Sequence, residues 1–438
     1  MPVFIRRIVN ALRPAGRDRP PAPGLLAPPR ECDTWRSYPA DGLTPQRLVA
    51  ILRAADAGDL AEQMALFEQM EEKDAHLYSV AQTRRLAVTG LPWRIVSAAE
   101  ADPDGDFDRA AADEAADYCR RALRALDGFD AVLGHLSRAI GRNVAVAELV
   151  WEADGEGVRL VEVVPVDFTR LSAGPLDSLR ILTDDAPHEG IALPANKFVV
   201  HATNAVSGHP IRGGLLRVSA LSYLAKHFAI KDWMIFAEVF GMPVRIARYE
   251  PNATPEEKRA LLDMLRRLGA DAVGIFSKAV ELEIKQTRVP GDVSPYEGIC
   301  HFFNRELSKA WLGQTLTTDT ARSLASVRAA EVHDRVRRDL RDDDLRKEAL
   351  TIRRDLLRVL TRMHFGADVE PPHFVRVKDP PADPAALADV LSRAVNDLGV
   401  RVPAAWAQSA LGVPAARADE AALPGRPNGR PASAETER

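Results

Sequence analysis

The sequence predicts an α+β fold in which two long helices bracket a small strand, helix, strand unit. Apolar residues recur at helical spacing over 215–240 and again over 296–312, and the short segments between them alternate with the period of β-strands. In the first half of the chain, helical patterns come first and strand patterns follow, without regular alternation of the two. That order favours α+β over a parallel α/β sheet.

Composition limits the classes of protein to consider. The 438 residues are 46% hydrophobic and 27% charged, as in globular proteins, and a chain of this length is expected to form two or three structural units. A net charge of -4 excludes a strongly basic nucleic-acid binder. The 58 basic residues are mostly arginine in an alanine-rich chain, which indicates a coding bias, so arginine content is poor support for nucleic-acid binding.

The chain carries no signal for secretion or for a membrane. No apolar run approaches the ~18 residues needed to span a bilayer, and the first residues lack a signal-peptide core with a cleavage site. We therefore expect synthesis in the cytoplasm and no membrane partner. Cys32, Cys119 and Cys300 are far apart and have no C-x-x-C spacing, so we expect reduced thiols, mostly buried.

Residues 1–40 are predicted to form a basic, proline-rich mobile arm. Residues 1–30 contain six arginines and one aspartate, and they cannot bury enough apolar surface to offset their ordering entropy. The arm is either an unstructured leader, which the composition favours, or a contact for DNA or a partner.

Residues 41–212 are predicted to combine helices with a small sheet. Thr44 and Pro45 are a helix cap and first residue, and a longer helix should run from Asp59 to about Val88. A hairpin is expected from two alternating segments joined by Ala153-Asp-Gly-Glu-Gly. The other expected elements are a strand near 91–97, helices near 109–126 and 133–140, hairpin strands over 144–152 and 158–164, and a strand over 197–201.

Two groups of potential metal ligands occur in this part. The aspartates at 102, 104, 106 and 108 suggest an EF-hand loop, but its sixth and twelfth positions hold Phe107 and Asp113 in place of Gly and Glu. His188, His201 and His209 have no second ligand at i+3 to i+5. A solvated loop and no metal site are therefore expected. The glycine-rich loop around His209 lacks a Walker sequence. We expect Gly213, Gly214 and Gly313 to act as hinges.

The central part has clear start and stop signals. Gly241 and Pro243 end the first long helix, and an alternating strand follows over 244–249. Thr254, Pro255 and Glu257 then form a complete helix start, in which hydroxyl and carboxylate satisfy free backbone amides. Further strands are expected over 273–276 and 280–284, and the second long helix should end at Gly313 with a positive φ.

Beyond residue 320 a third helix is predicted from Ala330 to about Met363. Its mixed charges indicate a solvated or inter-subunit face, and a phosphate-contacting surface is the less favoured alternative. A strand near 373–377, helices over 384–396 and 403–411, and a disordered tail from Pro414 complete the prediction.

Four sequence segments within this order of elements resemble those of a known protein family. They are Asn204-Ala-Val-Ser-Gly-His-Pro-Ile-Arg-Gly-Gly-Leu-Leu-Arg, Ala237-Glu-Val-Phe-Gly-Met-Pro-Val-Arg, Phe303-Asn-Arg-Glu-Leu-Ser-Lys-Ala-Trp-Leu-Gly-Gln-Thr-Leu-Thr-Thr-Asp and Leu398-Gly-Val-Arg-Val-Pro-Ala-Ala-Trp. Over roughly residues 40 to 415 the chain resembles the portal (head-to-tail connector) proteins of tailed bacteriophages, most closely the branch of Mu-like phages and prophages. These segments identify a structural part and no chemistry.

The resemblance implies a division of the chain and a role for each part. It implies a mobile arm (1–40), an α+β wing (41–212), a first stem helix (213–241), a clip (242–290), a second stem helix (291–313), a tunnel loop (314–320), a helical, wing-completing region (321–413) and a disordered tail (414–438). Subunits of such a family form a ring, usually of twelve, at one capsid vertex, through which double-stranded DNA is packaged and ejected.

The resemblance also implies partners. These are further copies of the chain, the terminase large subunit, the major capsid and scaffold proteins, tail adaptor proteins and non-specifically bound DNA. Assembly is expected in the host cytoplasm, and no cofactor is implied.

Residues that would face the channel are inferred from this division. Phosphate contacts add strongly to affinity, so a channel that lets DNA slide needs few of them. The uncharged polar residues of the tunnel loop suit this need, and three stem lysines are candidates for weak electrostatic guidance unless they pair with acids. The loop residues are Gln314, Thr315, Thr317 and Thr318, and the lysines are Lys226, Lys231 and Lys309.

Two other classes of function stay open. The first is a minor capsid or scaffold protein, and only the stem, clip, stem order of elements argues against it. A phage nuclease or protease lacks sequence support, because no acidic metal cluster on a strand, paired nucleophile and base, or nucleotide loop occurs. We expect no catalytic residues.

Overall fold

The structure is a computed structural model of the 438 residues. It describes residues 24–28, 40–154, 157–174, 178–203, 212–241, 245–249, 252–267, 273–277, 295–315, 327–378 and 384–413. Contacts divide the chain into two units, Met1–Arg376 and Val377–Arg438. The division falls inside the predicted region 321–413.

The first helices wrap the wing, and they include a break that the sequence did not indicate. The helices are α3 (Pro45–Asp56), α4 (Ala61–Lys73), α5 (Ala75–Thr89), α6 (Ala98–Ala101), α7 (Arg109–Arg124), α8 (Phe129–Ser137) and α9 (Ala139–Arg142). The single helix predicted over 59–88 is wrong, because Asp74 has extended backbone and caps α5. Its carboxylate accepts from the backbone amides of His76 and Leu77.

Two small sheets and a two-stranded ladder complete the wing. The hairpin is confirmed: β2 (Val144–Asp154) pairs antiparallel with β3 (Gly157–Pro165) and, on its other side, with β7 (Phe198–Ala202). The shorter strands are β4 (Leu171–Ala173), β5 (Leu179–Ile181) and β6 (Ile191–Ala192). β1 (Trp93–Val96) pairs antiparallel with β10 (His373–Arg376), so a strand from late in the sequence joins one from early in it.

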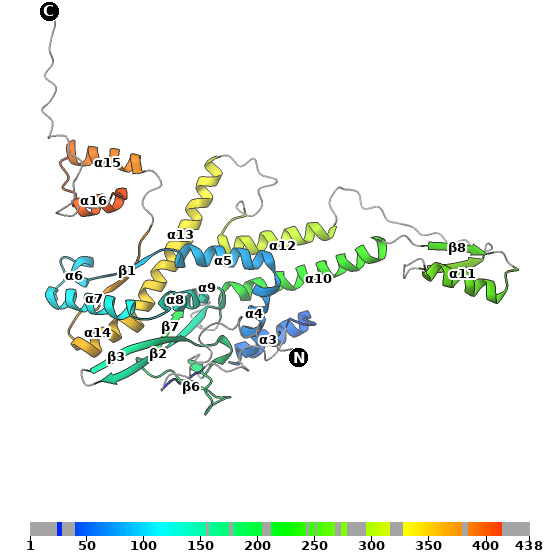
Figure 1. The fold of residues 1–438 in the computed structure, drawn as a ribbon, viewed down its shortest axis with the longest axis horizontal. Helices are drawn as coiled ribbons and strands as arrows, with labels where there is room; N and C mark the ends of the chain where they lie inside the picture. Colours follow the sequence, from blue (N-terminus) through cyan, green and yellow to red (C-terminus); the bar gives the residue numbers. More distant parts are fainter. Residues whose placement is uncertain are drawn as a thin grey trace, which may run out of the picture. The chain divides into compact units, whose positions relative to one another are not determined.

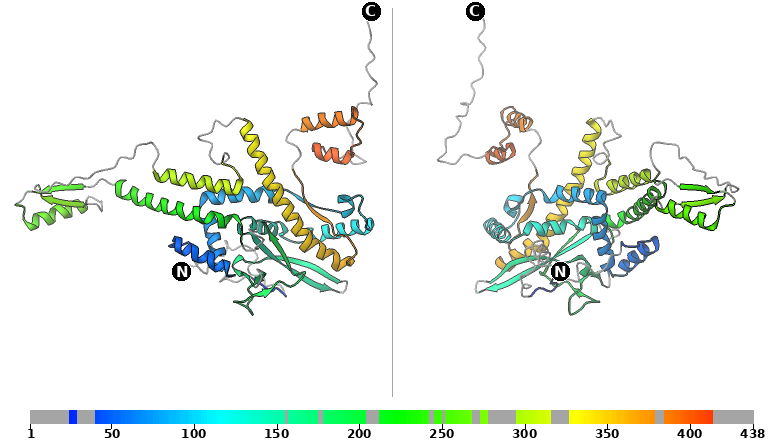
Figure 2. Two further views of the ribbon diagram at one scale, coloured as in Figure 1. Left: turned by 180° about the vertical axis from the view of Figure 1, so that it is seen from behind. Right: turned by 45° about the vertical axis from the view of Figure 1, so that its right-hand side comes forward.

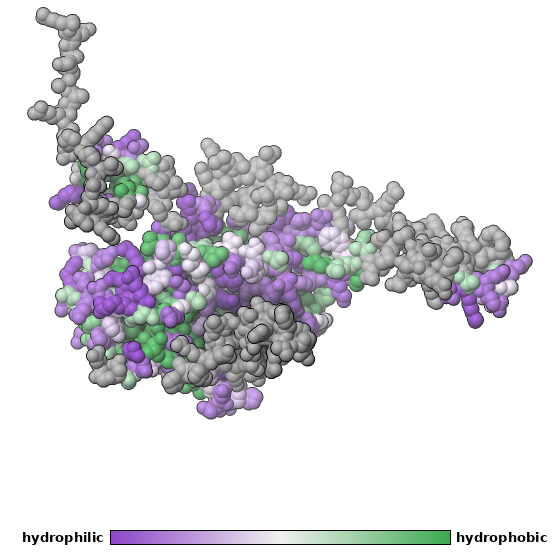
Figure 3. All heavy atoms as spheres, viewed as in Figure 1, coloured by the Kyte–Doolittle hydropathy of each residue, from purple (hydrophilic) through white to green (hydrophobic). Residues whose placement is uncertain are grey.

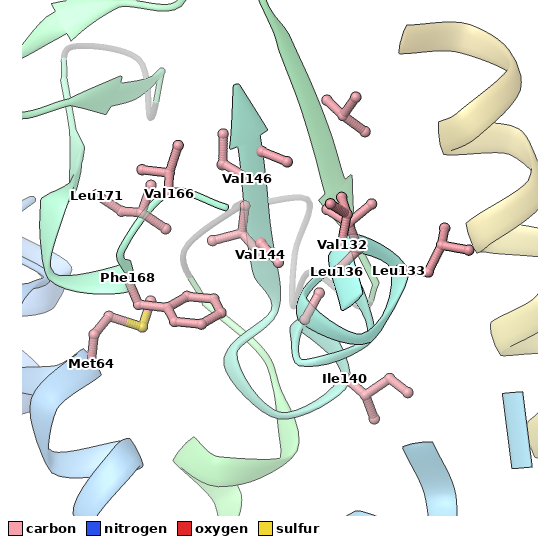
Figure 4. Packing of buried hydrophobic residues seen from close by; sticks show 14 of the residues in the cluster. Met64, Val132, Leu133, Leu136, Ile140, Val144, Val146, Val166, Phe168 and Leu171 are labelled. Carbon is pink, nitrogen blue, oxygen red and sulfur yellow. The ribbon is translucent and has the colours of Figure 1, made fainter. Parts of the chain in front are cut away.

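The hydrophobic core lies between these strands and helices. Figure 4 shows apolar side chains of α8 and α9 close to Val144 and Val146 of β2, and the Phe168 ring lies beside Met64 of α4. The side chains of Leu133, Val144 and Val146 are almost completely buried. The core therefore joins three segments separated by up to a hundred residues of sequence.

Two long antiparallel helices leave this core. α10 (Leu215–Gly241) and α12 (Pro295–Leu312) lie side by side in Figures 1 and 2. Near one end the Phe236 and Tyr296 ring centroids are 5.7 Å apart, and near the other the Trp311 indole N–H donates to the Ser219 hydroxyl. The two long helices predicted over 215–240 and 296–312 are thus confirmed.

The segment between the two helices contains a strand, helix, strand unit. β8 (Arg245–Tyr249) and β9 (Val273–Ser277) pair in parallel, and α11 (Pro255–Arg267) connects them. At the start of α11 the Thr254 hydroxyl accepts from the Glu257 amide and the Glu257 carboxylate accepts from the Thr254 amide, as predicted. The strand predicted over 280–284 lies outside the described residues.

The third long helix contains a wider turn. α13 (Val327–Ile352) continues through a π-helical turn over Arg353–Leu357 into α14 (Arg358–Phe365). At this turn Asp355 accepts from the Val200 amide and Arg354 donates to the Val200 carbonyl. These two side chains pair with backbone groups of β7, which is an edge strand among the strands that the structure describes. The second unit contains α15 (Pro384–Asn396) and α16 (Ala404–Leu411).

Part of the predicted mobile arm is held in place. Within residues 1–40 the structure describes 24–28, where the amides of Leu26 and Ala27 donate to the Glu148 carboxylate. Ala27 is buried, with 3% of its surface exposed. The prediction failed here because the acceptor lies 121 residues further along the chain. The rest of the arm before residue 24, and the predicted tail from 414, lie outside the described residues.

Acid should destabilise this fold through a buried histidine. His201 of β7 faces the Thr351 hydroxyl at 2.9 Å, and burial lowers its pKa from 6.5 to about 4, helped by Arg354 and Lys347. The unfolded chain binds the proton nearer pH 6.5, so the free energy of unfolding falls as the pH drops from about 6.5 toward 4. His201→Gln should flatten this slope by up to roughly 3 kcal/mol over that range.

The measurement is urea unfolding at several pH values, compared with the exposed-loop variant His188→Gln as the control. A slope that is the same in the His201→Gln chain and in the unmodified chain would show that this histidine is protonated equally in both states.

Candidate stem and channel surface

The base of the stem is a buried contact between α10, α12 and the wing. Trp311 of α12 has no exposed surface, and its indole N–H donates to the Ser219 hydroxyl of α10 at 3.0 Å. Leu216 and Leu307 are buried in the same core cluster as the wing residues. The apolar positions near the base therefore fix the helices to the wing and to each other.

A buried ion pair crosses this contact. Lys226 of α10 lies 2.7 and 2.9 Å from the two carboxylate oxygens of Asp74, the residue that begins α5. The exposed fractions of the two side chains are 9% and 0%. Beside the pair, the His76 ring lies 2.8 Å from the Ser308 hydroxyl of α12, and burial followed by the charge of Lys226 lowers the pKa of His76.

A second buried pair joins the stem base to α13. Arg84 of α5 makes two hydrogen bonds with Asp344, at 2.9 and 3.2 Å, and donates to the Trp311 carbonyl at 2.9 Å. The Arg84 guanidinium thereby connects α5 to α12 and α13. A third contact, from Arg217 to Asp56 at 2.7 Å, connects α10 to the end of α3. These pairings were not predicted from the sequence, because each joins residues far apart in the chain.

Away from its base, the stem exposes large apolar side chains. Leu221 is 67% exposed and Met234 is 69% exposed, which is unusual for residues of this kind on a folded monomer. Figure 3 shows hydrophobic surface along this part of α10 and α12. The exposed apolar face of the stem consists of Val218, Leu221, Phe228, Trp233, Met234, Ile235, Phe236, Ile299 and Phe302.

The three stem lysines have different surroundings. Lys226 cannot guide DNA, because it is buried and bound to Asp74 in the same chain; this expectation is corrected. Lys309 is exposed and forms an ion pair with Glu306 one turn earlier on α12. Lys231 is exposed on α10, where it lines a hollow together with Lys73 and Phe228. Of the three, Lys231 and Lys309 remain candidates for contact with a polyanion.

The described part of the predicted tunnel loop begins as expected. Gly313 ends α12 with φ of 68°, and a Cβ atom there would lie 2.8 Å from Val336 Cγ1. Gln314 is only 4% exposed, which contradicts its expected place in an open channel, and Thr315 is half-buried. Thr317 and Thr318 lie outside the described residues.

The predicted hinge is tightly packed. Gly213 and Gly214 have φ of 131° and 72°, as a turn made by glycine would require. A Cβ atom on Gly214 would lie 2.4 Å from the Gly141 carbonyl oxygen and 2.7 Å from the Asn143 amide nitrogen. The pair therefore lets the backbone approach α9 closely where the chain enters α10, and this packing leaves Gly214 little freedom to act as a hinge.

The part of the chain that the structure describes contains no cluster of three His, Cys, Asp or Glu side chains suited to a metal ion. Asp108 caps α7 by accepting from the amides of Ala110 and Ala111, a local role for one member of the acidic repeat. Burial raises the pKa of the Cys119 thiol to about 11. His209 lies outside the described residues. Among those same described helices, none is long and apolar enough to cross a membrane.

Substitution of Lys226 tests whether its buried ion pair with Asp74 stabilises the fold. Lys226→Met leaves the Asp74 carboxylate buried without its partner, so we expect a loss of roughly 3 to 5 kcal/mol in the free energy of unfolding. Lys231→Met, on the exposed side of the same helix, should change it by less than about 0.5 kcal/mol. Urea unfolding followed by circular dichroism measures both. Equal, small effects would contradict the buried pairing.

Comparison with known proteins agrees with this architecture. Residues 64–413 match the family described as portal protein of Mu bacteriophage. The chain is 30% identical to the portal protein of Escherichia phage Mu over 393 residues, 88% of this chain and 74% of that protein. It is 32% identical over 397 residues to the Mu-like prophage FluMu protein gp29 of Haemophilus influenzae, 89% and 74% of the two chains.

A solved structure shares the fold. A chain in the neck of an empty GTA particle, computed with C6 symmetry, aligns with a TM-score of 0.50 and 14% sequence identity, covering 84% of this chain and 94% of that one. The predicted fold class is confirmed by this likeness and by the mixed helices and sheets of the structure. From the family match and the identity over most of its length, the chain belongs to the portal protein family of Mu bacteriophage.

Proposed function

We propose that this chain is a portal subunit, which assembles with further copies into a ring around a channel for double-stranded DNA. The observation that carries the proposal is the exposed apolar face of an antiparallel helix pair whose base is fixed by buried ion pairs. Such a face is costly in water and is removed from it when identical subunits pack side by side. Membership of the portal protein family supports the same conclusion.

The proposed ring stands at one vertex of the capsid and usually contains twelve subunits. In it the stem helices of neighbouring copies cover each other's apolar residues, and the edges of the two-stranded β8–β9 sheet pair or pack between neighbours. The symmetry of the GTA neck, which belongs to that particle, is compatible with a closed rotational arrangement. The wing would supply the outer contacts between subunits.

The proposed channel contacts DNA weakly and without sequence preference. A net charge of -4 and few exposed stem lysines give the small number of phosphate contacts that sliding requires. Lys231 and Lys309 are the candidate cations, and the ion pair with Glu306 weakens the attraction of Lys309 for phosphate. Thr315, Thr317 and Thr318 are the proposed loop contacts, because hydroxyl groups bond phosphate without adding charge.

The proposed partners follow from this role. They are the terminase large subunit, the major capsid and scaffold proteins and tail adaptor proteins, with assembly in the host cytoplasm before the subunit becomes part of the virion. The role is structural and needs no catalysis. A minor capsid or scaffold protein is the alternative, and an annular particle with a central hole distinguishes a portal from it and from a nuclease or protease.

Ring assembly should depend on the exposed apolar face of the stem. The unmodified chain should form annular particles many times heavier than the 47.9 kDa subunit. Leu221→Glu combined with Met234→Glu should dissociate them, because ring contacts would bury two unpaired carboxylates in each subunit. Light scattering at micromolar concentration and negative-stain microscopy measure the outcome.

Leu350→Glu serves as the matched control, since Leu350 of α13 is 68% exposed and lies on a different helix. It should leave the rings intact. A folded, unmodified chain that stays at the subunit mass would contradict the ring, whereas intact rings of the Leu221→Glu, Met234→Glu chain would place the subunit contacts elsewhere.

The tunnel loop should affect DNA more than assembly. Thr317→Ala with Thr318→Ala should leave rings assembled and change the amount of DNA packaged per particle, because it removes uncharged phosphate contacts. Gly313→Val should do more harm, since a β-branched residue at φ of 68° is strained and its Cβ atom would meet Val336.

Gly298→Ala is the control for the glycine change, because Gly298 lies within α12 and nothing is within 4 Å of an added Cβ atom. It should package normally. Failure of the double threonine variant to assemble, with normal DNA in the particles that survive, would identify these residues as subunit contacts.

A further inference from the structure

The wing contains a carboxylate that is fully buried and faces the N-terminal segment. Glu148 lies on β2, the central strand of its sheet, and none of its surface is exposed. Its Oε1 atom accepts from the Leu26 amide at 2.6 Å, and its Oε2 atom accepts from the Ala27 amide at 3.0 Å. Lys197 Nζ lies 3.2 Å from Oε1, and it also donates to the Leu149 carbonyl at 2.9 Å.

A buried arginine binds the next residue of the same segment. Arg170 is 1% exposed, and its Nη2 atom donates to the Pro28 carbonyl at 2.6 Å. Its Nη1 atom donates to the Leu182 carbonyl, which fixes the guanidinium in place. Glu148 and Arg170 together bind two amides and one carbonyl from three consecutive residues.

These contacts recognise backbone and one small side chain. Backbone amides and carbonyls are the same for nearly every residue, so the hydrogen bonds require the bent backbone of Leu26 and Ala27 more than a particular sequence. Selectivity comes from Ala27, whose side chain is buried against the core, while Leu26 packs partly against the same core. An emptied site would leave the Glu148 carboxylate without two of its donors, which is unfavourable for a buried charge.

We propose that Glu148, Arg170 and Lys197 form a docking site for a short peptide that bends as Leu26 and Ala27 do, and that residues 24–28 of the chain are its resident ligand. We name these three residues the wing clasp. The clasp holds its segment by non-covalent contacts to the backbone, so it also binds the same segment supplied as a separate molecule.

A substitution that displaces residues 24–28 from the wing clasp of the full-length chain tests this proposal. Ala27→Asp places a second carboxylate next to Glu148 in a space that holds only a methyl group, and it should displace the resident segment. A fluorescent peptide with the sequence of residues 19–30 should then bind the Ala27→Asp chain at least tenfold more tightly than the unmodified chain, in which the clasp is filled. Fluorescence anisotropy measures the affinity.

Two controls make the result specific. The same peptide carrying Ala27→Asp should bind at least tenfold more weakly, and Glu148→Gln in the Ala27→Asp chain should weaken binding similarly, because an amide group accepts through one oxygen only. An Ala27→Asp chain that unfolds cooperatively but binds neither peptide, or binds both equally, would overturn the proposal.

A second measurement covers the case in which Ala27→Asp does not fold. In the unmodified chain, the amides of Leu26 and Ala27 should exchange hydrogen at least tenfold more slowly than in the Glu148→Gln chain. Fast exchange at both amides in the unmodified chain would show that the clasp is empty in solution and would overturn the proposal. Neither measurement depends on ring assembly, so the proposed portal function can fail independently.

Discussion

The Asp74 carboxylate is the constraint on which the arrangement of wing and stem depends. It ends α4, begins α5 by accepting two amides, and holds Lys226 of α10, all without exposure to water. A carboxylate in such a place needs all its donors, since burial of an unpaired charge is very unfavourable. One side chain consequently takes part both in the break between α4 and α5 and in holding α10.

The stem base and the exposed stem surface have opposite requirements. At the base, Trp311 and Arg84 join α12 to the wing and to α13 through buried contacts that leave little freedom of movement. Further along, large apolar side chains such as Leu221 and Met234 face outward and are mostly exposed in one subunit. A stem that is rigid at the base can present such side chains in a fixed geometry, as contact between identical subunits in a ring requires.

Local patterns in the sequence were sufficient for the elements but not for their contacts. The periodicity of 215–240, the caps at Thr254 and the stop at Gly313 predicted the stem helices and the start of α11 correctly, because these signals act within a few residues. The break at Asp74, the burial of Lys226 and the docking of residues 24–28 were missed. The burial of Lys226 and the docking of residues 24–28 each depend on a partner more than one hundred residues away, whereas the cap at Asp74 is a local signal that the apolar periodicity concealed.

The π-helical turn at Arg353–Leu357 sets a rotational register along α13 and α14. Such a turn accommodates one residue more than an α-helical turn, so removing that residue would rotate everything before it by about 100° relative to everything after it. Asp344 lies before the turn and contacts Arg84, whereas Thr361 lies after it and contacts Cys119 of α7. The same continuous helix thus contacts α5 before the turn and α7 after it, so the length of this segment matters as well as its composition.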